Sequence, residues 1–178
     1  AATEVSRMAV GNPGALSTPT TYTSPIEVSQ HAWDHIEGTP FGTRGGMVVT
    51  HSFPADGAYV FEVETLFGRG TGFEDIDLAI DGEAVALLAL EHNGGSRMPT
   101  QTEPIFVPAG QHQVSAAFVR KIEGPYEDRL SPFAWSSVGG EDSQSWANYG
   151  ITALPHLREL TITGPVFAAG VSETASRR

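Results

Sequence analysis

The feature that most constrains the fold is the alternation of apolar and polar side chains in residues 58–67. Tyr59, Phe61 and Val63 fall on one side of an extended chain, and Glu62 and Glu64 fall on the other. A repeat of two residues is typical of a β-strand with one buried face, whereas a helix would distribute the same side chains around its surface. The segment therefore predicts a half-buried strand.

The same alternation recurs in short segments that turn-forming residues separate. Pro54-Ala-Asp-Gly57, Asp81-Gly82 and Pro108-Ala-Gly110 are typical turn sequences. We interpret residues 38–46 as a turn and residues 91–100 as a polar loop. The predicted strands are residues 47–53, 58–67, 75–80, 83–90, 105–107, 111–121 and 157–163, with residues 15–28 as an extended edge segment. Short strands with Gly and Pro turns between them predict an all-β fold, a β-sandwich or jelly roll.

We expect the inward residues of these strands to form one core and their alternate neighbours to be more exposed. The expected core residues are Tyr59, Phe61, Val63, Ile76, Leu78, Ile80, Val114, Ala116 and Phe118. With 178 residues the chain is long enough for one such domain. We place the β-sandwich domain at residues 15–165, an N-terminal linker or short helix from a preceding domain at 1–14, and a C-terminal linker at 166–178. The chain begins at Ala1 without Met, which suggests a piece of a longer protein.

Composition and charge exclude several classes of function. The formal net charge is −11, with only 10 Lys and Arg, which argues against binding to nucleic acid or to an anionic membrane surface. No apolar run approaches the roughly 20 residues of a membrane span, so we expect no membrane insertion. The chain has no Cys, which excludes disulfides, thiolate metal sites and covalent haem attachment. Because no recognisable catalytic motif is present either, we expect this domain not to be an enzyme.

Three stretches together resemble one family. They are residues 35–46 running to Phe53-Pro-Ala-Asp-Gly57, residues 77–85 (DLAIDGEAV), and residues 149–165 (YGITALPHLRELTITGP) with the Ser-Arg-Arg end. The chain resembles a segment between domains of unknown function in large exported bacterial proteins that also carry a c-type cytochrome domain. Its core is similar to calcium-dependent xylan-binding modules.

The resemblance implies a non-catalytic β-sandwich in an extracytoplasmic location, periplasmic or on the cell surface. It also implies the flanking domains of the parent protein as partners, a polysaccharide ligand such as a xylan-like glycan, and possible dependence on Ca²⁺. The haem-binding Cys-x-x-Cys-His is absent, so no haem is expected in this chain.

Aromatic side chains are the candidates for contact with a sugar. Trp33, Trp135 and Trp146, with Tyr126 and Tyr149, could stack on the apolar side of a pyranose. All but Trp33 lie in a long stretch without strand signals, and binding residues are frequent in loops. The alternative is that these rings plug the end of the sandwich or pack on a neighbouring domain. We therefore predict a carbohydrate-binding module, with a structural module that docks the flanking domains as the alternative.

Acidic side chains are the candidates for a metal site. If the two acidic strands paired, four carboxylates would crowd one face and favour Ca²⁺, which prefers oxygen ligands. The residues are Glu62, Glu64, Asp75 and Asp77. The alternative is a solvated acidic face. His31, Asp34 and His35 could ligate zinc or copper, or they could simply be polar loop residues.

Arg44 lies in the Gly-rich sequence Gly42-Thr-Arg-Gly-Gly46. The sequence precedes a predicted strand rather than a helix, so it does not match a phosphate-binding loop. Arg44 is instead a candidate ligand-binding residue, or a buried or interface clamp for a carboxylate or a carbonyl.

Overall fold

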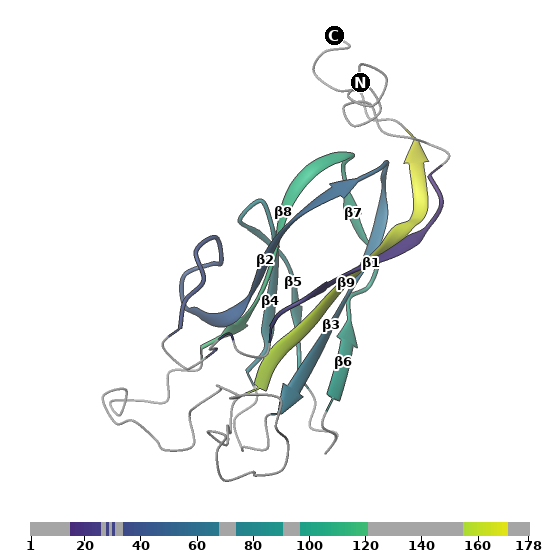
Figure 1. Cartoon of the computed structure of the whole chain (residues 1–178). Helices are drawn as coiled ribbons and strands as arrows, with labels where there is room; N and C mark the ends of the chain where they lie inside the picture. The colour runs from purple at the N-terminus through teal and green to yellow at the C-terminus, as the bar shows by residue number, and fades with distance from the viewer. Residues whose placement is uncertain are drawn as a thin grey trace, which may run out of the picture.

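The structure is an all-β fold of two antiparallel sheets that face each other (Figure 1). The computed structural model describes residues 15–25, 28, 30, 34–67, 74–90, 97–120 and 155–170. In these ranges the chain forms nine strands. Within the same ranges, no helix is long and apolar enough to cross a membrane. The predicted all-β sandwich is therefore confirmed.

The first sheet is five-stranded and has the order β1-β9-β3-β6, with β7 also paired to β3. Its strands are β1 (Thr18–Thr23), β3 (Asp56–Phe67), β6 (Arg97–Gln101), β7 (Ile105–Val107) and β9 (Pro155–Gly170). The long β9 pairs with β1 on one side and with β3 on the other, so it lies between these two strands in the sheet. It continues past residue 165 to Gly170.

The second sheet is four-stranded and has the order β2-β8-β4-β5. Its strands are β2 (Thr43–Phe53), β4 (Ile76–Ile80), β5 (Glu83–Leu88) and β8 (Gly110–Val119). The hairpin between β4 and β5 turns at Asp81 and Gly82, which have φ angles of 51° and 83°. Two residues with positive φ suit a tight hairpin, as the Asp-Gly sequence predicts. The Asp81 carboxylate also accepts the Gln113 N–H at 2.8 Å, which fixes the turn to β8.

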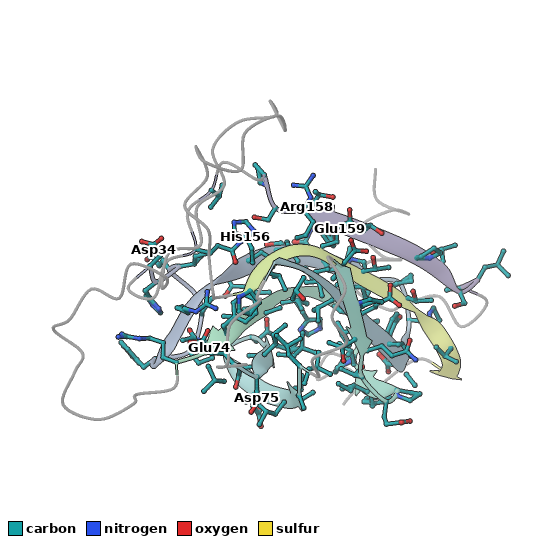
Figure 2. All side chains as sticks on the ribbon, turned by 90° about the horizontal axis from the view of Figure 1, so that it is seen from below. Asp34, Glu74, Asp75, His156, Arg158 and Glu159 are labelled. Carbon is teal, nitrogen blue, oxygen red and sulfur yellow. The ribbon has the colours of Figure 1, made fainter. Side chains whose placement is uncertain are left out.

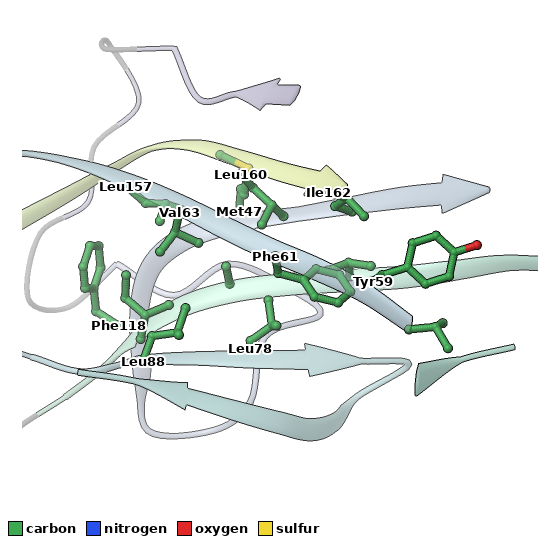
Figure 3. Close-up of a cluster of buried hydrophobic side chains, with 14 of the residues drawn as sticks. Met47, Tyr59, Phe61, Val63, Leu78, Leu88, Phe118, Leu157, Leu160 and Ile162 are labelled. Atoms are coloured by element: carbon green, nitrogen blue, oxygen red, sulfur yellow. The ribbon is translucent and has the colours of Figure 1, made fainter. Parts of the chain in front are cut away.

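One core lies between the two sheets (Figure 3). It contains the residues expected from the alternation, and Ile80 packs at its border. Burial of this apolar surface is the main driving force of folding. The expected exposure of alternate neighbours holds for Glu62 but is wrong for Ala79, Ser115 and Ala117, which are 0%, 2% and 0% exposed. These side chains are short and stand on β4 and β8, the inner strands of their sheet.

Two of the sequence interpretations are corrected. Residues 97–101 are not loop but form β6, which lies at the edge of its sheet and pairs with β3. Pro99 is tolerated because an edge strand needs hydrogen bonds on one side only. The second strand begins at Thr43 rather than Met47, because the Gly-rich residues are part of β2 and a bulge between Arg44 and Met47 adjusts the register to β8.

The strand register brings several strand ends together at one end of the sandwich. Phe118, near the end of β8, pairs with Arg44 at the start of β2 and with Ile76 at the start of β4. In the other sheet, Phe67 at the end of β3 pairs with Pro155 at the start of β9. We call this end, which lies lowest in Figure 1, the Arg44 end.

The bulge in β2 yields the first testable prediction, because it brings a glycine against the neighbouring strand. Gly46 has φ of 89°, and a Cβ there would lie 2.1 Å from the Ala116 carbonyl oxygen. We expect Gly46→Ala to lower the free energy of unfolding by roughly 2 kcal/mol or more beyond the cost of the positive φ alone. Urea denaturation measures this difference.

Gly42 supplies the matched control. Its φ is similar at 83°, but a Cβ there has nothing within 4 Å. Gly42→Ala should therefore lose only about 1–2 kcal/mol for the left-handed conformation. Equal losses in the two variants would contradict the close approach of β2 and β8 at Gly46.

Candidate functional site

A buried guanidinium organises the Arg44 end. Arg44 is 0% exposed and forms an ion pair through Nε with the carboxylate of Glu74, which lies two residues before the start of β4 at Ile76. Its Nη1 donates to the Gln30 carbonyl at 2.9 Å, and Nη2 donates to the Pro155 carbonyl at 3.2 Å. The guanidinium carbon also lies 4.4 Å from the centre of the Phe118 ring. Arg44 is therefore the buried clamp for a carboxylate and carbonyls that the sequence predicted as one of its two roles.

The side chain of Gln30 links the two sheets beside Arg44. Its Oε1 accepts the N–H of Gly46 in β2 at 3.1 Å and the N–H of Leu157 in β9 at 2.9 Å. Its Nε2 donates to the Leu157 carbonyl at 3.0 Å. Gln30 is 0% exposed, so these bonds are made away from water. The bonds hold the chain around residue 30 against both sheets.

His156 completes this polar network in its neutral form. Gln30 Nε2 can only donate, so His156 Nδ1, 3.2 Å away, accepts its hydrogen bond. The proton must then lie on Nε2, which donates to the Val28 carbonyl at 2.8 Å. Burial lowers the pKa of His156 below its ordinary value of 6.5. The charges of Arg44 and Arg158 also lower this pKa, and the bond to Val28 partly opposes them. Figure 2 views this end directly, with His156 near the strand ends.

The segments that carry the tryptophans are bordered by described residues at the Arg44 end. Residues 121–154, which include Trp135 and Trp146, connect the end of β8 to the start of β9. Trp33 lies between Gln30, held as described, and Asp34, whose carbonyl accepts the Gly45 N–H at 2.8 Å. The segments that carry the chain's three Trp are thus bordered on both sides by residues of the same end of the sandwich. The side chains of Trp33, Tyr126, Trp135, Trp146 and Tyr149 themselves lie outside the described residues.

The predicted calcium site is not assembled from the four acidic residues as expected. Glu62 and Glu64 stand on β3 of the first sheet, whereas Asp75 precedes β4 and Asp77 lies within it, in the second sheet. These strands do not pair, because β3 pairs with β6, β7 and β9 and β4 pairs with β5 and β8. The two carboxylate pairs alternate with core residues and so lie on opposite outer faces. Burial raises the pKa of Asp77.

Among the described residues, no group of three or more His, Asp or Glu side chains could hold a metal ion. Of the predicted zinc or copper set, His31 lies outside the described residues, and His35 is an exposed loop residue. Calcium binding therefore stays a prediction without an assigned set of ligands.

The sequence analysis missed an exposed aromatic side chain in the loop before β2. Phe41 is 101% exposed, and its ring is nearly parallel to that of His35, with 4° between the planes and 6.3 Å between the centroids. The loop reaches the Arg44 end, because the Gly42 carbonyl accepts the N–H of Arg120 at 2.9 Å. A Phe within a Gly- and Pro-rich turn belongs to no alternating pattern, so its exposure had no signal in the sequence.

Comparison with known proteins gives structural likenesses only. No protein-family model matches the chain, and no curated protein sequence matches it significantly. A family 35 carbohydrate binding module from Clostridium thermocellum is similar with a TM-score of 0.46 and 10% identity, over 82% of this chain and 97% of that chain. The CBM36-1 domain of a multidomain xylanase from the hindgut metagenome of Trinervitermes trinervoides gives 0.47 and 13%, over 83% and 97%.

A family 35 carbohydrate binding module from an environmental isolate gives a TM-score of 0.45 and 13% identity, over 91% of this chain and 95% of that chain. Likenesses of this degree identify neither a family nor a ligand for this chain.

The buried ion pair predicts a large loss of stability when one partner is removed. Arg44→Met would leave the Glu74 carboxylate buried without its guanidinium, which typically costs about 3–5 kcal/mol. Arg44→Met combined with Glu74→Leu should recover part of this loss, because no charge is then buried. Chemical denaturation of both variants measures the difference. A single variant as stable as the wild type would contradict the structural role of Arg44.

The neutral state of His156 predicts a pH dependence of stability. Because its pKa is lowered in the folded state, the unfolded chain binds the proton more readily. The contribution of His156 is therefore complete above pH about 6.5 and declines as the pH falls from there toward the lowered pKa. We expect His156→Gln to reduce the slope of unfolding free energy against pH in this window. Burial also lowers the pKa of His51, so some slope should remain.

Leu87→Ala is the control for this experiment, because Leu87 is exposed and has no titratable group. It should keep the wild-type slope in urea titrations between pH 7.5 and 4.5. An unchanged slope in His156→Gln would show that the buried histidine is not held neutral.

Proposed function

We propose that this domain is a non-catalytic carbohydrate-binding module of a larger exported protein and that it binds a polysaccharide at the Arg44 end. The cytochrome-linked parent, the extracytoplasmic location and the xylan-like ligand rest on the sequence resemblance. The place of binding rests on the structure of the described residues.

The observation that carries the proposal is that the Trp-bearing segments are tied to a single, internally bonded end of the sandwich. Arg44 donates to the carbonyls of Gln30 and Pro155. Gln30 in turn accepts the N–H groups of Gly46 in β2 and Leu157 in β9. The borders of the Trp-bearing segments at residues 30 and 155 are therefore held in place. Ligand sites commonly form where loops stand on a rigid scaffold. Among the described residues of the opposite end, short turns such as Asp81-Gly82 join neighbouring strands.

The charge of the chain favours an uncharged ligand. A formal net charge of −11 repels uronate-rich or sulfated polysaccharides over distances up to about a Debye length of 10 Å. Aromatic rings bind the C–H face of a pyranose without any need for charge, and carboxylate or amide oxygens can accept hydrogen bonds from its hydroxyl groups. We therefore place neutral polysaccharides, xylan among them, first among the ligands to be tested.

The test is retention on immobilised neutral polysaccharides, with xylan, β-glucan and galactomannan as probes. We expect the wild-type domain to be retained by at least one of them, and Trp135→Ala or Trp146→Ala to weaken retention about tenfold or more. The unfolding midpoint should stay near that of the wild type. Phe106→Ala is the control, because Phe106 is 59% exposed on β7, which pairs with the start of β3 at the opposite end, and its removal should leave retention unchanged.

Parallel columns with Ca²⁺ or with a chelator test the calcium dependence. If the ion is required, the chelator should abolish retention and lower the unfolding midpoint, since a ligand of the folded state stabilises it. Failure of the wild type on every polysaccharide would overturn the proposal. The docking module for flanking domains would then be preferred.

A further inference from the structure

The loop before β2 presents an exposed aromatic surface that lies outside the segments that carry the tryptophans. Phe41 is 101% exposed, and the nearly parallel ring of His35 lies beside it. We propose that the parallel rings of Phe41 and His35 are a preformed contact site for the apolar face of a pyranose. This inference rests on the proposed function and adds to it a contact site separate from the tryptophans.

The loop that carries the two rings is held at both ends by backbone hydrogen bonds. The Asp34 carbonyl accepts the Gly45 N–H at 2.8 Å, and the Gly42 carbonyl accepts the Arg120 N–H at 2.9 Å. These bonds tie the loop to β2 and to the residue that follows β8. The backbone that carries the rings is therefore already ordered in the folded protein, which lowers the entropy cost of binding.

Two internal bonds shape the loop between its anchored ends. Thr39 Oγ1 donates to the Ile36 carbonyl at 2.7 Å, and Thr43 Oγ1 donates to the Pro40 carbonyl at 2.6 Å. Gly38 adopts a φ of 93°, and a Cβ added there would lie 3.4 Å from side-chain atoms of Val48 and Gln113. The loop thus packs on side chains of β2 and β8, while its aromatic tip remains in water.

A pyranose fits this surface better than the alternative occupant, a second copy of the chain. A sugar ring offers a flat row of C–H groups of about the size of one aromatic ring, and these groups are attracted to the electron-rich face of that ring. A second copy would bring another charge of −11 to the surface, whereas a neutral sugar brings none. The exposed Glu37, on the same loop, is an acceptor available for sugar hydroxyls.

The experiment compares variants on the polysaccharide that retains the wild type best, by affinity electrophoresis at increasing polysaccharide concentration. We expect Phe41→Ala to raise the dissociation constant about tenfold and Phe41→Trp to restore or tighten binding. Phe106→Ala is the matched control, because Phe106 is 59% exposed on β7 of the other sheet and should have no effect. Both exposed Phe residues can be removed without loss of the core, so the unfolding midpoints should match that of the wild type.

The outcomes separate this inference from the proposed function. If the wild type binds and Phe41→Ala binds equally well, the ring pair is not a contact site, while the module itself still binds carbohydrate. If the wild type binds no polysaccharide, both proposals fail together. A concentration-dependent dimer in sedimentation velocity that Phe41→Ala abolishes would assign the rings to self-association and overturn the inference.

Discussion

The structure depends on a positive charge buried between the two sheets. A guanidinium without partners would be costly in this position, because the low-dielectric interior replaces its hydration poorly. Arg44 is compensated by the Glu74 carboxylate, by two carbonyl oxygens and by the face of Phe118. These partners come from four separate parts of the chain, so the charge is satisfied only when both sheets and the chain around residue 30 are in place. Such an interaction favours one arrangement of the sheets over others that bury the same apolar surface.

The two ends of the sandwich differ in how their strands are connected. At one end, tight turns such as Asp81-Gly82 join neighbouring strands directly. At the Arg44 end, the polar network of Gln30 and His156 fixes the positions from which longer segments leave the sheets. A fixed base allows a loop residue such as Phe41 to be exposed without weakening the core. The polysaccharide binding that we propose is placed at the end where this buried charge lies.

Strands with strict alternation were predictable, because every second side chain of β3 must enter the core, and the Asp-Gly hairpin followed from local turn chemistry. Other features were not. β6 contains Pro99 and polar residues, and it is a strand only because β3 offers it an edge. Arg44 and Glu74 are thirty residues apart, so no local pattern indicates their pairing. The expected carboxylate cluster assumed that β3 and β4 pair, but the chain places them in different sheets. Pairing between distant segments depends on topology, which alternation does not determine.

The central claim is that a polysaccharide binds at the Arg44 end. Amide chemical-shift mapping by NMR, with the best-retained neutral polysaccharide cut to short oligosaccharides, tests it most directly. The account predicts shifts at Gly45, Arg120 and the loop of residues 34–42, and none at Asp81 or Gly110 at the opposite end. Shifts confined to the opposite end, or no shifts at saturating oligosaccharide, would contradict it.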